Sequence, residues 1–170
     1  TPNVSSGVER MRISPEGYVT KPYQTAFCAR GDQGIFNMPS GQQIQFNYYS
    51  TMNGTGWPNS RNSAYNTSTY KYTAPVSGVY SFTVNLYFRD DNLTNLFSLV
   101  PRINGSEVNQ GGDIMFFFSV KNISPDTTVS GTLQIYLTAG QQFDVARRSG
   151  QTGTHSSYMP HSSFSGFLIG

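Results

Sequence analysis

One run of residues constrains the fold of this chain more than any other feature. In the run 78–88, positions 80, 82, 84 and 86 hold Tyr, Phe, Val and Leu, whereas positions 81, 83 and 85 hold Ser, Thr and Asn. Successive side chains of a β-strand point to opposite faces of its sheet. The alternation therefore predicts a long strand with one buried face and one face toward solvent or a partner.

Short runs of this kind recur along the chain, and turn residues separate them. Only 12% of the residues are charged while 14% are aromatic, and no convincing helical repeat is present. This composition is typical of strand-and-turn proteins, so we expect an all-β sandwich or barrel. The predicted strands cover residues 25–29, 44–49, 71–73, 78–88, 97–103, 113–120, 129–137, 142–146 and 163–169.

The charges and the apolar runs exclude two classes of partner. The formal charge of +2 is spread along the chain, and Arg147 and Arg148 form the only pair of adjacent basic residues, so we expect no nucleic-acid binding. No apolar run approaches the roughly 20 residues of a membrane-spanning helix, so we expect no membrane insertion. The run 114–118 is apolar on both faces of its predicted strand, which favours contact with another subunit.

The first residues and the single cysteine carry further expectations. The chain begins at Thr1 without the pattern of a signal peptide, so we expect a piece of a longer protein. Residues 1–22 hold two short extended segments separated by Ser14-Pro15-Glu16, and we expect a connector or the end of a fibre shaft. Cys28 lies between small and aromatic residues and is expected to be a buried hydrophobe without a disulfide partner.

Several motifs resemble a known family. Two segments of the chain are YTAPVSGVYSF at residues 72–82 and SFSGFLI at residues 163–169. They resemble the central and C-terminal signatures of the C1q-like globular-head domain, which belongs to the larger tumour-necrosis-factor-like superfamily. AFCA at residues 26–29 is similar to the family's first strand, with Cys in place of the more usual Ser. The family's penultimate hairpin is similar to the segment from GTL at residues 131–133 to GQQFDV at residues 140–145.

The resemblance covers residues 23–170 and implies a ten-strand jelly-roll sandwich of the C1q/TNF-like type. It also implies a parallel homotrimer whose N-termini continue together into a stalk, an arrangement that converts weak single contacts into avidity. The residues expected to form the structural core are Phe27, Tyr80, Phe82, Phe164, Gly166 and Phe167.

The stalk indicates where such a domain would act. No collagen-like Gly-x-y repeat precedes residue 23, and ERMRISPEGYV at residues 9–19 resembles a short repeat of bacteriophage tail fibres and other phage appendages. We therefore expect a virion location, at a tail fibre or another appendage. The alternative is an extracellular, secreted C1q-like pattern-recognition module, in which the Asn-x-Ser/Thr sites of the chain would matter.

The residues that carry chemistry do not indicate an enzyme. His155 and His161 lie in one Ser-rich segment without a recognisable nucleophile motif nearby. Asp90 and Asp91 are adjacent, so their side chains cannot readily flank a glycosidic bond. Their oxygens are instead candidate ligands for a structural calcium ion, and we expect no other cofactor.

Recognition of a saccharide or protein requires aromatic surfaces beside amide, hydroxyl and guanidinium groups. Long loops of this chain offer such groups, and an anionic partner could bind the guanidinium of a loop arginine. The alternatives are that the aromatic residues pin the loops to the sandwich and that the arginines form a solvated rim. The candidate contacts are Tyr48, Tyr49, Trp57, Arg61, Tyr65, Arg147, Arg148 and His155.

The favoured hypothesis is a non-enzymatic, trimeric tip that binds a saccharide or protein on a host cell surface. Two alternatives remain open at this point. One is a purely structural role in trimerisation, capping or decoration of a virion appendage, and the other is the secreted recognition module.

Overall fold

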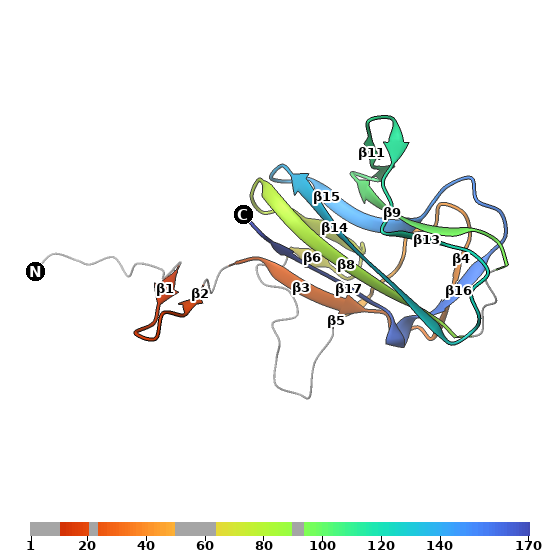
Figure 1. Ribbon diagram of the computed structural model, residues 1–170, viewed down its shortest axis with the longest axis horizontal. Helices are drawn as coiled ribbons and strands as arrows, with labels where there is room; N and C mark the ends of the chain where they lie inside the picture. The colour runs from red at the N-terminus through yellow and green to blue at the C-terminus, as the bar shows by residue number, and fades with distance from the viewer. Residues whose placement is uncertain (1–10, 21–23, 50–63, 90–93) are drawn as a thin grey trace, which may run out of the picture.

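The computed structural model describes residues 11–20, 24–49, 64–89 and 94–170, and it is all-β over these ranges apart from one 3-10 turn, Met159–His161. Two main sheets face each other in a sandwich (Figure 1). A short antiparallel hairpin of β1 (Arg12–Ile13) and β2 (Val19–Thr20) precedes the sandwich in the chain. Within the described part, no helix has the length and apolar character needed to cross a membrane.

The first main sheet, named here the β8 sheet, has five strands in the order β14-β8-β17-β3-β5. Strands β14 and β8 pair antiparallel along their whole length, from Thr127 opposite Phe88 to Leu137 opposite Gly78. The C-terminal strand β17 lies between β8 and β3. The bounds are β3 (Ala26–Arg30), β5 (Tyr48–Tyr49), β8 (Gly78–Phe88), β14 (Thr127–Leu137) and β17 (Ser163–Leu168).

The second main sheet, named here the β9 sheet, has six strands: β10-β9-β15-β7-β6 in order, with β13 also paired to β9. Two smaller pairs join β16 to β4 and β11 to β12. The bounds are β4 (Ile35–Met38), β6 (Tyr65–Asn66), β7 (Lys71–Thr73), β9 (Phe97–Ile103), β10 (Ser106–Glu107), β11 (Asn109–Gln110), β12 (Asp113–Ile114), β13 (Phe118–Val120), β15 (Gln142–Arg147) and β16 (His155–Tyr158). The expected all-β jelly-roll sandwich is confirmed.

Aromatic rings fill the space between the two sheets. Phe82 of β8 stacks on Phe143 of β15 with the ring centroids 4.0 Å apart. Phe27 meets Phe164 edge to face at 4.9 Å. Stacked and edge-to-face contacts of this kind add stabilisation beyond the burial of apolar area. The alternation predicted for β8 is confirmed, because Tyr80, Phe82, Val84, Leu86 and Phe88 are all fully buried.

The prediction of one continuous strand over residues 113–120 is wrong, because its middle is not a strand. The segment forms two separate strands, β12 and β13, and the residues between them belong to neither. Phe117 packs into the core and its backbone passes over Gly131, where a Cβ would stand 2.3 Å from the Phe117 carbonyl oxygen. Phe116, next to it, remains exposed. The apolar run is therefore divided between two pairings, because Ile114 lies in the β11–β12 pair while Phe118 pairs with Leu99 of β9.

Two predictions of burial are also wrong. Phe167 was expected in the core, but 49% of its surface is exposed. Its neighbours in β17, Phe164 and Gly166, face the core, so Phe167 must face outward in the same strand. Cys28 is only half-buried for the same reason, because Phe27 and Ala29 take the inward positions of β3.

Candidate functional site

Two adjacent clefts lie along one side of the β9 sheet, and both include Ser149 in their lining. The first, named here the Arg102 cleft, has a volume of about 440 Å³ and the second, the Arg148 cleft, about 400 Å³. Volumes of this size are within the range of small-molecule binding sites. Gly41, Arg102, Gly105, Ser106, Glu107, Asn109 and Ser149 line the Arg102 cleft. Leu96, Arg148, Ser149, Gly150, Gln151 and Thr152 line the Arg148 cleft.

A buried carboxylate orients Arg102. The Nε atom of Arg102 donates to Oδ1 of Asp144 at 2.6 Å, and Asp144 is fully buried. Burial raises the pKa of the Asp144 carboxyl, while the hydrogen bond and the charge of Arg102 act in the opposite direction. The other carboxylate oxygen, Oδ2, has no hydrogen-bond partner among the described residues, so Arg102 offsets only part of the cost of burial.

A tight turn brings Glu107 to the same cleft. Asn104 and Gly105 both have positive φ, 51° and 83°, as a two-residue hairpin turn requires, and they connect β9 to β10. Oε1 of Glu107 accepts a hydrogen bond from the backbone N–H of Ser149 at 2.7 Å. Strand β10 is thereby attached to the segment 148–152, which lines the Arg148 cleft.

The fully buried side chain of Arg147 anchors the segment 148–153 through hydrogen bonds. Its Nη1 donates to the carbonyl oxygens of Met38 and Gly153 at 2.8 and 2.6 Å, and its Nη2 donates to that of Thr152 at 2.6 Å. Charged donors form strong hydrogen bonds with carbonyls in a buried setting. Arg147 therefore shapes the loop and cannot contact a ligand, so its prediction as a binding residue is wrong.

Arg148 is the one arginine of the predicted pair that lines a cleft. Its guanidinium carbon lies 5.5 Å from the ring centroid of Phe116, a cation–π contact. Its backbone N–H donates to the carbonyl of Ser98 at 2.9 Å. The side chain is half-buried, which leaves part of the guanidinium facing the cleft.

Burial also removes two other residues from the predicted ligand contacts. Tyr65 stacks on Phe27 at 4.7 Å, and its hydroxyl donates to the carbonyl of Phe46 at 2.9 Å inside the core. His155 is buried on β16 and meets Phe97 edge to face at 5.7 Å. Both predictions are wrong because strands that the sequence did not reveal, β6 and β16, carry these residues into the sandwich.

The remaining predicted site residues do not assemble into one cluster within the described ranges. Tyr48 is exposed, and the guanidinium carbon of Arg30 lies 4.9 Å from the centre of its ring. Tyr49 pairs with Ala29 through the backbone of β5. Trp57, Arg61, Asp90 and Asp91 lie outside the described residues. The described residues hold no group of three or more His, Cys, Asp or Glu side chains that could hold a metal ion.

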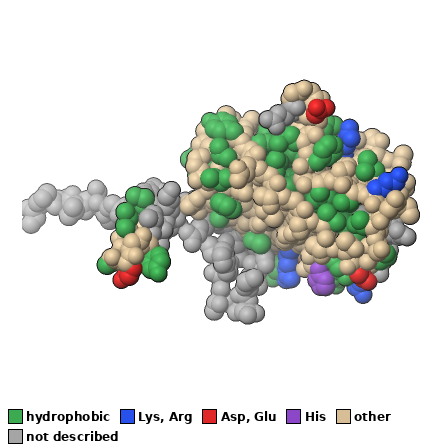
Figure 2. Space-filling view, viewed as in Figure 1, with side chains coloured by type: hydrophobic (Ala, Val, Ile, Leu, Met, Phe, Trp, Pro, Cys, Tyr) green, Lys and Arg blue, Asp and Glu red, His purple; other side chains and the backbone are tan. Residues whose placement is uncertain are grey.

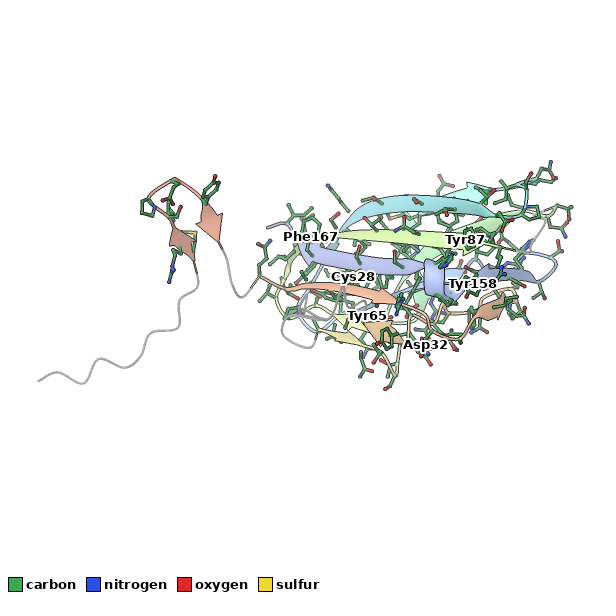
Figure 3. All side chains as sticks on the ribbon, turned by 90° about the horizontal axis from the view of Figure 1, so that it is seen from below. Cys28, Asp32, Tyr65, Tyr87, Tyr158 and Phe167 are labelled. Carbon is green, nitrogen blue, oxygen red and sulfur yellow. The ribbon has the colours of Figure 1, made fainter. Side chains whose placement is uncertain are left out.

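A second candidate surface is the outward face of the β8 sheet. At the end where β17 finishes, four exposed apolar side chains gather on neighbouring strands, named here the apolar end: Val79, Tyr136, Phe167 and Ile169. Figure 3 shows Phe167 at this end of the sheet, with Tyr87 and Tyr158 at the opposite end. In the space-filling view, hydrophobic side chains emerge at several places on the visible face, separated by polar surface (Figure 2).

The middle of the same face is polar, and its side chains bond to one another. The hydroxyl oxygens of Thr83 and Thr132 lie 2.9 Å apart across β8 and β14. The amide of Asn85 donates to the hydroxyl of Ser163 on β17 at 2.9 Å. These hydrogen bonds connect the side chains of β14, β8 and β17 across the outward face.

Comparisons with known proteins agree on the fold. A family model described as the C1q domain matches residues 26–169. The structure resembles the globular domain of the zebrafish complement 1qA protein, with a TM-score of 0.57 and 18% identity over 86% of this chain and 98% of that one. It also resembles the Eiger TNF protein of S. frugiperda, with a TM-score of 0.58 and 16% identity over 86% and 94% of the two chains. No curated protein matches the sequence.

Proposed function

Because the chain belongs to the C1q domain family, whose model matches residues 26–169, we propose that it is a non-enzymatic recognition domain that acts as a homotrimer. In this proposal the trimer forms the tip of a viral fibre and binds a saccharide or protein on a host cell surface. Domains of the C1q and TNF type are generally trimerising, non-enzymatic binding modules, which supports the trimer and the recognition role.

The observation that carries the trimer is the apolar end of the β8 sheet. Tyr136 and Phe167 are 59% and 49% exposed, and they lie on strands flanking β8. Single exposed apolar side chains are common on protein surfaces, but large ones grouped on one face mark an interaction site. Packing of three copies through this face would bury the group and leave the β9 sheet outward.

The location at a fibre rests on the connector. Residues 9–19 resemble a phage appendage repeat, and the part of this segment that the structure describes folds back on itself in the β1–β2 hairpin. In the hairpin, the N–H of Ser14 donates to the carbonyl of Tyr18 at 2.9 Å. We propose that residues 1–22 are this connector and that residues 23–170 are the globular domain.

The first test is the solution mass of residues 1–170 by light scattering. The expected mass is three times the 18.8 kDa of one chain. The double variant Phe167→Ser/Tyr136→Ser should dissociate to monomers, because it removes the two largest side chains of the apolar end. Ile35→Ser is the matched control, since Ile35 is equally exposed but lies on β4, outside the β8 sheet. A monomeric wild-type chain would contradict the proposal.

Two further measurements test whether the domain binds a receptor or has a structural role, and whether it holds a calcium ion. Binding of the labelled trimer to host cells supports the receptor-binding role, whereas a stable trimer that binds no cell surface points to a structural role. Repeating the mass measurement with a calcium chelator tests the proposed structural calcium ion, which dissociation on chelation would support.

A further inference from the structure

We propose that the Arg102 cleft and the Arg148 cleft form one continuous site for a saccharide that carries an acid group. The acid group binds Arg148, and the hydroxyl groups of the sugar bind in the Arg102 cleft. This inference rests on the proposed recognition function and names its ligand class and its contact residues.

The Arg148 cleft suits an anion. Arg148 is the only charged side chain in the described lining of that cleft. Phe116 covers one face of its guanidinium, and no side-chain hydrogen bond within the described ranges engages its N–H groups. A planar guanidinium with its edge unoccupied is shaped for bidentate contact with a carboxylate or phosphate.

The Arg102 cleft suits hydroxyl groups instead. The charge of Arg102 is offset by Asp144, and Glu107 adds a negative charge, so an anion is disfavoured there. The Nη groups of Arg102 have no acceptor among the residues described, so they remain available as donors. Hydroxyl groups both donate and accept, which matches a guanidinium next to the carboxylate of Glu107 and the amide of Asn109.

The two clefts are held in one fixed arrangement before a ligand arrives. Ser149 belongs to both linings, and its N–H is bonded to Glu107. Gln151 is fixed against Ser98, to whose hydroxyl its amide nitrogen donates at 2.8 Å. The buried Arg147 holds the carbonyls of Thr152 and Gly153. A preorganised site loses less conformational entropy on binding, which favours affinity.

The site also remains accessible in the proposed trimer. Its residues lie along the β9 sheet and the loops beside it, whereas the proposed subunit contact uses the outward face of the β8 sheet, on the other side of the sandwich (Figure 1). Each trimer would present three copies of the site. Linked copies raise the apparent affinity for a repetitive polysaccharide well above that of one site.

The test measures retention of the trimer on immobilised saccharides arranged in matched pairs. Uronic-acid oligosaccharides are paired with their carboxyl-reduced forms, and phosphorylated sugars with their dephosphorylated forms. We expect at least one acid-bearing member to be retained about tenfold more strongly than its neutral partner, as a charged hydrogen-bonded pair allows. The two kinds of pair distinguish a carboxylate from a phosphate as the acid group.

Two variants assign the contacts. Arg148→Gln should abolish the preference for the acid-bearing member. Glu107→Gln keeps an acceptor for the N–H of Ser149 and should weaken retention of both members of a pair about fivefold, through its hydroxyl contacts. Arg89→Gln is the matched control, because Arg89 also lies over an aromatic ring, that of Tyr158 at 5.1 Å, but away from the clefts. Its retention should equal that of the wild type.

Three outcomes would overturn the inference: equal retention of both members of every pair, an unchanged preference in Arg148→Gln, or no retention by any saccharide. These outcomes differ from failure of the proposed function. If the trimer binds cells and both variants bind equally well, the site is wrong while the recognition role stands. If the domain is monomeric or binds no cells, the recognition role fails whatever the saccharides show.

Discussion

Gly166 lies so close to the ring of Phe82 that a Cβ at this position would stand 2.4 Å from the Cδ1 atom of Phe82. The same Cβ would stand 2.9 Å from Cε1 of Phe27. Both rings belong to the aromatic core, so neither can move without displacing others. The absence of a side chain at Gly166 therefore sets the distance between β17 and the rings beneath it.

Gly166→Ala should lower the free energy of unfolding by about 1–3 kcal/mol, because overpacking forces the core rings off their positions. Chemical denaturation at a fixed protein concentration measures the change. Gly170→Ala is the matched control, since nothing lies within 4 Å of the Cβ it would add. Equal stability of the two variants would show that the core accommodates the methyl group.

Arg147→Met should lower the free energy of unfolding by about 3 kcal/mol or more, because three backbone carbonyls lose a charged donor. The amide of Ser149, which donates to Glu107, should also exchange its hydrogen faster, since the loop loses its anchor. Arg148→Met, at the neighbouring position, should change stability by only about 0.5 kcal/mol or less. Slow exchange in the Arg147 variant would mean that other contacts hold the loop.

Asp144 should make stability fall as pH rises, contrary to the usual behaviour of a paired carboxylate. Burial raises its folded-state pKa above the ordinary value of 3.8. Between these two pKa values the folded chain binds more protons than the unfolded chain, so the contribution of Asp144 is greatest below pH 3.8 and is lost as pH rises through the folded pKa. The difference in unfolding free energy between wild type and Asp144→Asn, measured across this range, isolates the effect. A difference that grows with pH would show that Arg102 outweighs burial.

Tyr65→Phe should cost about 1–2 kcal/mol of stability, because the buried carbonyl of Phe46 loses the hydroxyl that donates to it. Retention on cells or saccharides should not change, since the ring is inside the core. Tyr48→Phe serves as the control on an exposed ring and should leave stability unchanged within about 0.5 kcal/mol. Loss of binding without loss of stability in the Tyr65 variant would restore Tyr65 as a ligand contact.

The strands with a clear alternating pattern could be predicted from the sequence. The segments 71–73, 78–88 and 97–103 match β7, β8 and β9 at both ends. Strand β16 was not predicted, because His155, Ser156 and Ser157 carry no apolar signal. Its pairing with β4 joins segments more than 100 residues apart, and its buried Ser157 is satisfied by the carbonyl of Tyr87.

The orientation of Phe167 could have been predicted, because a strand that places Phe164 and Gly166 inward must place Phe167 outward. The burial of Arg147 could not. Arginine is rarely buried, and the three carbonyls that it binds come from Met38 and from a loop whose path depends on the whole sandwich.

Only part of the candidate site could be found in the sequence. Arg148 was identified as half of the only basic pair, and it lines a cleft. Arg102 and Glu107 were missed, since each is a single charged residue within or next to a strand. The one local signal was Asn104-Gly105, a dipeptide that favours a tight hairpin and thereby places Glu107 opposite Arg102.

The position of β17 affects how the domain can be made in a cell. Residues 163–168 follow all the other strands of the β8 sheet in the chain, yet they occupy the middle of that sheet, between β8 and β3. During synthesis, the edges of β8 and β3 that pair with β17 therefore remain unpaired until these residues emerge from the ribosome. A product that ends before residue 163 exposes the facing edges of β8 and β3, which are templates for aggregation, so the sheet is continuous only once β17 has been made.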